Sequence, residues 1–380
     1  MIIKNAMVYT PDKSFVQKDI VIRQGHFVSD EAEALADEEV IDASGCYAIP
    51  GLLDIHFHGA MGMDVGDATM EAYQKIAEYE ASAGVTAICP ATMTLPVEEL
   101  ENILKVGAEF RKSNHKGADL VGFNMEGPFI SHPKKGAQNE KYIIQADGAV
   151  VDRFFSASEG LVKIIGLAPE ENPGFEDYIK ENKDKVIISL AHTNADYETA
   201  KKAFDAGACH AVHLYNAMPG LTHRQPGVVG AVSDCSWVNA EIICDGIHIH
   251  PAAVRAAFRL NGADRMVLIS DTLRCAGCPD GEYDLAGQTV VKKGKYCNLK
   301  EEGNIAGSVT NLADCMRIAV TQMDIPLETA IACATINPAR AIHVDDQYGS
   351  IEEGKVGNVV LLNMDRELTL NKVILRGVVI

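Results

Sequence analysis

Long hydrophobic runs are missing from this sequence of 380 residues. No segment approaches the roughly 18 consecutive apolar residues that a membrane-spanning helix requires. The N-terminal stretch MIIKNAMVYTPDKSF has neither the apolar core nor the cleavage site of a secretory signal. We therefore expect a protein that works in the cytoplasm and does not have a membrane as its partner.

Positive charge is also scarce. The chain has 34 Lys and Arg against 53 Asp and Glu, which gives a formal net charge of -19. Such a protein repels nucleic acid and anionic membranes, so neither is expected as a partner. An anionic substrate would need local cations that hold it against the overall field.

The sequence also lacks a second CxxC motif. Cys275 and Cys278 form a CxxC motif in RCAGCPDG, but a structural zinc ribbon needs two such pairs. A thioredoxin-like site would open a helix, whereas Gly277 and Pro279 indicate a loop. Without a secretory signal, the 10 cysteines are expected to be reduced thiols, and we assign this pair no role.

Eight apolar runs of strand length fill the middle of the chain. They are nearly continuous, which is typical of parallel strands buried on both faces. Segments of helical period separate several of them, so the alternation predicts an α/β protein with a (β/α)8 TIM-like barrel. A doubly wound open sheet is the alternative, although no GxGxxG follows the first run. The runs span residues 51–59, 84–94, 119–129, 161–170, 185–193, 209–217, 239–248 and 264–272.

The two ends of the chain have a different pattern. Residues 1–50 and 344–380 contain short strands with period-two alternation and turns. Because chain ends often lie close together, they predict one small β-sandwich domain beside a catalytic barrel of residues 51–343. The hairpin-like segment 289–304 is expected near the barrel mouth.

Polar side chains interrupt the apolar runs where the predicted strands end. In a barrel these ends meet at one rim, where catalytic groups lie. A single histidine in a strand is usually a hydrogen-bonded core residue, but that explanation does not suit a whole set converging on one rim. The set comprises His56, His58, Glu126, His192, His213, Asn216, Asp245, His248 and Asp271.

One carboxylate with neutral imidazoles suits a borderline divalent ion such as Zn²⁺ or Fe²⁺. Glu126, His192 and His213 would carry a total charge of -1, so the site would stay positive and keep an open position for water. Such a site lowers the pKa of the water to roughly 7. Asp271, from the neighbouring eighth strand, is the candidate base.

This arrangement resembles the amidohydrolase superfamily. The HxH after the first strand, the histidines after strands five and six, and the aspartate after strand eight carry the resemblance. Within the superfamily, the blocks MEGPFISHPKKGAQN, HLYNAMPGLTHRQPG, CDGIH and SDTLRCAGCPDGEYDLAGQ are similar to those of N-acetylglucosamine-6-phosphate deacetylases, over essentially the whole chain. The resemblance implies hydrolysis of a phosphorylated N-acetyl amino sugar to acetate and glucosamine 6-phosphate, in amino-sugar catabolism and recycling.

The resemblance also implies residue roles. Glu126, His192 and His213 match metal ligands, and Asp271 matches the general base that later acts as acid. The family completes its phosphate pocket across a subunit interface, which implies a homodimer. Asn216 and Ala217 match residues that hold the sugar, Arg224 and His248 match phosphate-binding residues, and the further substrate contacts are Ala137, Gln138, Asp245, Gly246, Ile247, Asn304, Ile305 and Ala306.

Arg224 has support from the residues themselves. It is the one Arg or Lys in the Pro- and Gly-rich segment 218–237, which is long for a barrel loop. Its guanidinium suits bidentate recognition of phosphate. A solvated loop arginine is the alternative.

His56 and His58 raise the question of a second metal. Two residues apart on a strand, they share one face. Some members of the family lack this HxH and use one ion, and carry a histidine that polarises the acetamide carbonyl where this sequence has Gln138. A second cation could supply the missing charge. We therefore hypothesise a second divalent ion on His56 and His58, bridged by Glu126. The alternative is a one-metal site in which both histidines are hydrogen-bonded.

Two other functions compete with the deacetylase. An amidohydrolase that opens cyclic amides would usually bridge two metals with a modified lysine after strand four, where this chain has GLAPE. A catalytically inactive binding protein on the same fold would have lost a ligand or the base, but Glu126, His192, His213 and Asp271 are all present.

Overall fold

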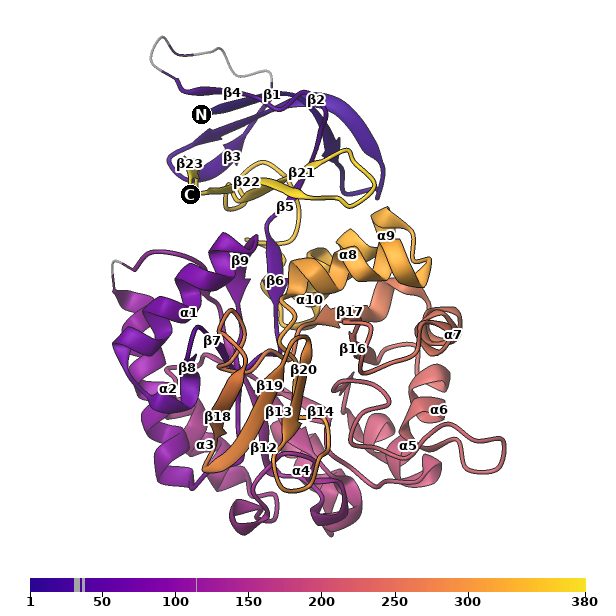
Figure 1. The fold of residues 1–380 in the computed structure, drawn as a ribbon. Helices are drawn as coiled ribbons and strands as arrows, with labels where there is room; N and C mark the ends of the chain where they lie inside the picture. Colours follow the sequence, from indigo (N-terminus) through magenta and orange to yellow (C-terminus); the bar gives the residue numbers. More distant parts are fainter. Residues whose placement is uncertain (31–34, 36–37, 114) are drawn as a thin grey trace.

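A barrel of parallel strands forms the larger part of the protein (Figure 1). The structure, a computed structural model, describes residues 1–30, 35, 38–113 and 115–380. Within these ranges, one ladder has the strand order β10-β12-β13-β14-β15-β16-β17, and a second has the order β11-β9-β6. The barrel strands are β6 (Leu52–Asp54), β9 (Val85–Ile88), β10 (Ala91–Thr92), β11 (Asp119–Leu120), β12 (Phe123–Phe129), β13 (Val162–Leu167), β14 (Ile187–Leu190), β15 (His210–Ala211), β16 (Asn239–Ile243) and β17 (Met266–Ile269).

Backbone hydrogen bonds between the first and last strands close the ring. Asp271 N donates to His56 O over 2.9 Å, and His58 N donates to Thr272 O over 2.7 Å. The predicted barrel is thus confirmed, and the open-sheet alternative is wrong. Closure also places the HxH segment directly beside Asp271.

Helices surround the barrel. Apolar side chains of the strands alternate between the interior, where Leu53, Ile164 and Ile269 pack, and the layer beneath the helices. The helices are α1 (Met70–Ser82), α2 (Val97–Lys112), α3 (Gly148–Ala157), α4 (Phe175–Asn182), α5 (Tyr197–Ala206), α6 (Gly227–Asp234), α7 (Pro251–Asn261), α8 (Leu312–Met323), α9 (Leu327–Ala334) and α10 (Ile336–Ala341). Segment 218–237, treated above as one long loop, contains α6, so the loop itself is shorter than expected.

A separate sheet joins the two ends of the chain at the top of Figure 1. In the described part of the chain its order is β23-β22-β21-β5-β1-β2-β3, and β4 also pairs with β1. Antiparallel pairing of β21 with β5 brings the two segments together. The exact domain boundaries stay a prediction. The strands are β1 (Ile2–Tyr9), β2 (Phe15–Arg23), β3 (His26–Val28), β4 (Val40–Asp42), β5 (Cys46–Pro50), β21 (Val359–Asn363), β22 (Leu370–Leu375) and β23 (Val378–Val379).

An antiparallel sheet lies across the barrel mouth. It consists of β18 (Gly281–Leu285), β19 (Gln288–Lys293) and β20 (Tyr296–Leu299). Gln288 Nε2 donates to the backbone oxygen of Ala137 over 2.6 Å, which ties this sheet to the loop after β12. The excursion predicted from residues 289–304 is therefore present, with β18 as an additional strand. A short pair, β7 (Gly59–Ala60) and β8 (Met63–Asp64), follows the HxH segment.

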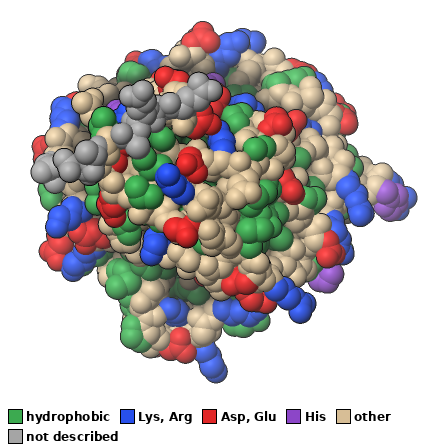
Figure 2. Space-filling view, turned by 90° about the horizontal axis from the view of Figure 1, so that it is seen from above, with side chains coloured by type: hydrophobic (Ala, Val, Ile, Leu, Met, Phe, Trp, Pro, Cys, Tyr) green, Lys and Arg blue, Asp and Glu red, His purple; other side chains and the backbone are tan. Residues whose placement is uncertain are grey.

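The described helices include none with the length and hydrophobicity needed to cross a bilayer. Acidic and basic side chains are interspersed on the face that Figure 2 shows, at the end of the molecule occupied by the small sheet.

Candidate active site and metal centre

A cavity opens at the rim of the barrel, beneath the sheet β18–β20. Its lining combines the predicted polar residues of the strand ends with apolar side chains of the covering loops. The lining residues are His58, Met93, Glu126, Gly136, Ala137, Gln138, His192, His213, Asn216, Ala217, His248, Asp271, Leu273, Leu285, Asn304, Ile305 and Gly307.

Glu126 lies at the centre of the polar cluster. Its Oε1 is 2.9 Å from His192 Nε2 and 2.9 Å from His213 Nε2. These two nitrogens are themselves 3.1 Å apart. The other oxygen, Oε2, is 3.4 Å from His58 Nε2 and accepts a 2.5 Å hydrogen bond from Gln138 Nε2. His56 Nε2 is also 3.3 Å from Oε1, so one oxygen of the carboxylate faces three histidines and the other faces His58.

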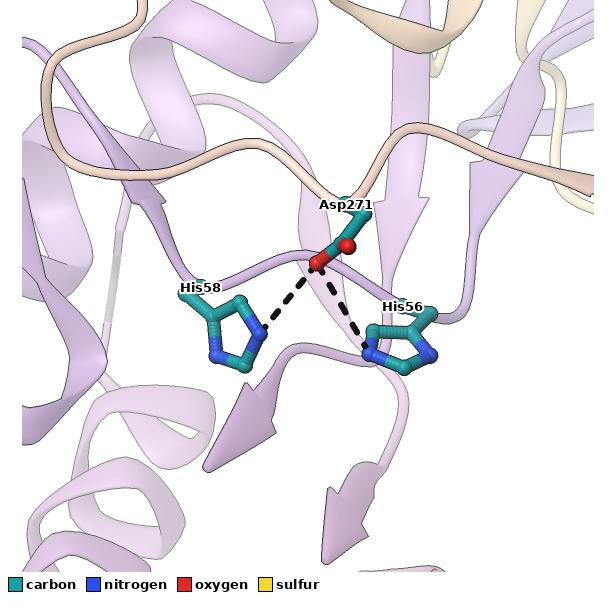
Figure 3. Close-up of side chains that lie close together, drawn as sticks. All are labelled: His56, His58 and Asp271. Carbon is teal, nitrogen blue, oxygen red and sulfur yellow. Dashed lines mark ion pairs between the residues drawn. The ribbon is translucent and has the colours of Figure 1, made fainter. Parts of the chain in front are cut away.

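A second group forms around Asp271 (Figure 3). Its Oδ1 is 3.3 Å from His58 Nε2 and 3.9 Å from His56 Nε2. The ligand atoms of His56, His58 and Asp271 all lie within 4.8 Å of one another, as do those of His56, Glu126 and His213. His56 thus belongs to both groups.

The four histidines share one orientation. Each has a partner for Nδ1, and each directs Nε2 into the cluster. The Nδ1 partners are Ala91 O for His58, Lys134 O for His192, Asn216 O for His213 and Glu241 Oε2 for His56, at 2.8 to 3.1 Å. Because a carbonyl or an ionised carboxylate can only accept, Nδ1 carries a proton, so in the neutral ring Nε2 would present its lone pair to a metal ion.

The backbone conformation is strained at three residues of the cluster. His192 (φ 42°), His213 (φ 25°) and Asp271 (φ 53°) adopt left-handed conformations where their strands end. Such conformations are uncommon for residues with a Cβ and persist where the surroundings enforce them, often at functional sites.

Both carboxylates of the cluster are held in their ionised form. Burial alone raises the pKa of Glu126, but the neighbouring His192 and His56 bring it well below its usual range. Burial likewise raises the pKa of Asp271, and the hydrogen bond and charge of His58 outweigh it. In return, and against the effect of burial, Asp271 and Glu126 raise the pKa of His58 to about 10. Without a metal, protons on His56 and His58 therefore balance the two carboxylates, and a divalent cation would take the place of those protons.

These observations fit a bound metal ion. Imidazole nitrogens and carboxylate oxygens are the donors that zinc and ferrous iron prefer. In addition, His56 Nε2 is completely buried and makes no hydrogen bond within the described part of the chain. A buried ring nitrogen without a hydrogen bond is costly, and a cation would be a partner for it.

Gln138 connects the cluster to the second strand. Besides donating to Glu126, its side-chain oxygen accepts from Thr94 N over 2.6 Å, and the side chain is only 2% exposed. A carboxamide held at both ends fixes the rotation of the Glu126 carboxylate.

His248 and Asn216 line the same cavity as the cluster of candidate ligands. His248 Nδ1 is 2.8 Å from Asp245 Oδ2, whose carboxylate also accepts from the backbone nitrogens of Ile247 and His248. Although burial opposes it, Asp245 raises the pKa of His248 above its usual value. Its imidazole is therefore the candidate cation of the cavity wall.

Some predicted contacts do not line the cavity in the described chain. These are Asp245, Gly246, Ile247 and Ala306, and also His56, which is fully buried. Arg224 is exposed, in the loop that leads into α6. A phosphate site for Arg224 would have to be completed by another surface, as the resemblance implies, and this role stays a prediction.

No role was predicted from the sequence for Glu241 or His210, two buried residues behind the site. Glu241 lies on β16 with 0% exposure, and its oxygens are 2.8 Å from His56 Nδ1 and 2.9 Å from His210 Nε2. Burial raises the pKa of Glu241, but the charge of His56 and the bond to His210 lower it to about 2. A lone acidic residue inside the apolar run NAEIIC was the available signal.

The comparison with known protein families decides the family. The amidohydrolase family model matches residues 47–380. The chain belongs to the amidohydrolase family.

Individual members of the amidohydrolase family give a closer comparison. The chain is 32% identical to N-acetylglucosamine-6-phosphate deacetylase of Bacillus subtilis, over 97% of this chain and 95% of that one. It is 34% identical to N-acetylgalactosamine-6-phosphate deacetylase of Escherichia coli O157:H7, over 83% of each. A solved mutant of the Mycobacterium smegmatis N-acetyl-D-glucosamine-6-phosphate deacetylase, in complex with N-acetyl-D-glucosamine-6-phosphate, has a TM-score of 0.91 at 26% identity, covering 100% of this chain and 98% of that one.

Proposed function

We propose that the protein is a metal-dependent deacetylase that hydrolyses the acetamide of N-acetyl-D-glucosamine 6-phosphate to D-glucosamine 6-phosphate and acetate. The observation that carries this proposal is the meeting of a Glu126–His192–His213 ligand set with an ionised Asp271 in one cavity. The named relatives support the choice of substrate.

Glu126, His192 and His213 would hold one divalent ion, zinc or ferrous iron, and His56 and His58 would hold a second. When bound, such an ion polarises the amide carbonyl and activates water. The negative charge of Glu126 and Asp271 favours the cation. The Nδ1 hydrogen bonds of the histidines orient their rings before any ion arrives.

Asp271 performs the proton transfers. Its carboxylate faces the cavity in the ionised form, so it accepts a proton from the attacking water. Protonated, it then donates to the departing nitrogen of the sugar, which leaves as an amine while acetate forms. Hydrolysis consumes one water, and Asp271 returns to its starting state.

The remaining wall residues would position the sugar. Asn216 offers an amide, and Ala217 and Ala137 offer backbone groups beside it. The apolar side chains of Leu273, Leu285 and Ile305 limit the access of bulk water to the amide. The sheet β18–β20 carries part of this wall, so it also completes the site.

The 6-phosphate would be bound by His248 and by Arg224 within a homodimer. Arg224→Ala should mainly raise KM, because the phosphate is remote from the amide. Losing a charge-assisted hydrogen bond costs roughly 1.5–3 kcal/mol, or about 10- to 150-fold. Steady-state kinetics with phosphorylated and unphosphorylated N-acetylglucosamine measure this. The variant should narrow the wild-type preference for the phosphate, and an unchanged preference would remove Arg224 from the phosphate site.

N-Acetylgalactosamine 6-phosphate is a second candidate substrate, because a deacetylase named for it is 34% identical to this chain. The two sugars differ at one hydroxyl. We propose a preference for the glucose epimer, tested by comparing kcat/KM for both sugar phosphates and for a dihydropyrimidine. A higher kcat/KM for the galactose epimer would change the named substrate. Preferred opening of the cyclic amide would replace the deacetylase proposal.

We also propose that the protein works in the cytoplasm. All 10 cysteines are free thiols, which suits a reducing compartment.

A further inference from the structure

Glu241 is an unusual residue for its position. It lies in the middle of β16, a strand whose neighbouring residues Ala240, Ile242 and Ile243 are fully buried and apolar. A buried carboxylate is costly unless each oxygen is hydrogen-bonded. A carboxylate at this position in the barrel wall therefore needs specific hydrogen-bond partners.

Those partners link three strands of the barrel. Oε2 accepts from His56 Nδ1 over 2.8 Å and from the backbone nitrogen of His213 over 3.2 Å. Oε1 accepts from His210 Nε2 over 2.9 Å. One carboxylate on strand seven thus contacts the ring of His56, after strand one, and the backbone of His213, after strand six. Both of these residues are candidate metal ligands.

His56 differs from the other three histidines in this partner. His58, His192 and His213 donate Nδ1–H to neutral backbone carbonyls, whereas His56 donates to a carboxylate. A carboxylate partner raises the basicity of the opposite ring nitrogen and fixes the tautomer. In His56 that opposite nitrogen, Nε2, is the buried atom without a hydrogen bond in the described chain, 3.3 Å from Glu126 Oε1.

We propose that Glu241 is a positioning residue that holds His56 in the Nδ1-protonated tautomer, so that Nε2 can bind a metal ion. Its second contact holds the backbone at His213, whose φ of 25° is strained, and so supports the other ligand set. This inference rests on the metal site in the proposed function but not on the identity of the substrate.

His210 completes the arrangement. Its donated hydrogen bond occupies Oε1, so the carboxylate cannot rotate away from His56 without leaving a buried N–H unpaired. His210 itself is 0% exposed and lies on β15, one strand away from Glu241. Its role is therefore to hold Glu241, and it does not face the cavity.

Glu241→Gln is the variant that tests the proposal, because it keeps shape and volume. A carboxamide has one acceptor oxygen and one NH₂ donor, so it cannot accept from both His56 and His210. With NH₂ toward His56, the stable tautomer carries its proton on Nε2, where it competes with the metal. With the oxygen toward His56, the hydrogen bond is neutral and no longer raises the basicity of Nε2. Glu80→Gln is the matched control, since Glu80 is also 0% exposed and its oxygens have no hydrogen-bond partner in the described chain.

Zinc binding by the purified metal-free proteins, in competition with a chromophoric chelator, is the readout. We expect the affinity of one equivalent to fall about 10- to 100-fold in E241Q, the usual effect of losing such a partner, and not in E80Q. The visible spectrum of the Co²⁺-substituted protein should change only in E241Q. In a His56→Asn background, E241Q should cause a much smaller loss, limited to the effect of the contact with the His213 backbone.

Several outcomes would overturn the proposal. One is wild-type zinc affinity in folded E241Q, and another is an equal loss with and without His56, which would indicate a merely structural role. If E241Q does not fold, Glu241→Asp keeps the charge but withdraws it from His56, and undiminished affinity there would count equally against the proposal. A wild-type protein that binds no zinc would overturn the metal-dependent function, and this inference with it.

Discussion

Replacing Asp271 by Asn is expected to lower kcat by at least roughly 10²- to 10⁴-fold, the usual contribution of a general acid–base group. The change preserves the shape of the side chain at the cavity wall. A carboxamide cannot take a proton from water or return it to the leaving amine. Because Glu126, His192 and His213 remain, the fold and the binding of zinc to that ligand set should be retained.

Steady-state rates, zinc content and thermal unfolding of D271N, measured together, check this expectation. A lowered rate with retained metal assigns the proton transfers to Asp271. Loss of all bound metal would instead make Asp271 chiefly a ligand, as its 3.3 Å approach to His58 Nε2 allows. Near-normal turnover would remove Asp271 from the mechanism.

The His56→Asn, His58→Asn double variant is the second change with a large expected effect. Both histidines direct Nε2 toward Glu126 and Asp271, at distances of 3.3 to 3.9 Å. Without them, the ligand set on the Asp271 side of Glu126 is lost. We expect bound metal to fall from two equivalents to one per subunit, with a large loss of turnover, because the neutral Gln138 cannot replace a cation at the carbonyl.

Elemental analysis of protein purified with zinc present gives the number of ions directly. His132→Asn serves as a control, since His132 pairs with Glu171 and is not among the residues that line the cavity. One equivalent in wild type and double variant alike, with equal activity, would establish the one-metal alternative.

The residues at the strand ends could be predicted because the topology of the barrel brings the carboxyl ends of its strands together. Once eight buried runs alternate with helices, their carboxyl ends must meet, so Glu126, His192, His213 and Asp271 follow from their places in the chain. The HxH pair follows from the two-residue period of a strand. These predictions needed no knowledge of side-chain packing.

The supporting contacts could not be predicted in this way. Glu241 and His56 are 185 residues apart, and their 2.8 Å contact depends on which strand face each occupies. Cys275 illustrates the same limit, because its sulfur lies 3.7 Å from that of Cys297 on β20, whereas the sequence motif pairs it with Cys278. Helix α6 was hidden for another reason, since it follows Pro226 and contains Gly227 and Gly230, residues that are typical of a loop.

The position of Arg224 shows a limit of reasoning from one subunit. Arg224 is exposed and is not among the residues that line the cavity, so the phosphate role proposed for it requires the second subunit that the resemblance implies. Sequence resemblance proposes that surface, and the mutation of Arg224 tests it.

Metal-dependent acetate release tests the central claim most directly. Protein stripped of metal by a chelator is incubated with N-acetyl-D-glucosamine 6-phosphate before and after zinc or ferrous iron is restored, and acetate and glucosamine 6-phosphate are quantified. We predict negligible release by the stripped protein and, after restoration, rapid release of both products in equal amounts. No acetate from the metal-loaded protein, or equal release with and without metal, would contradict the account.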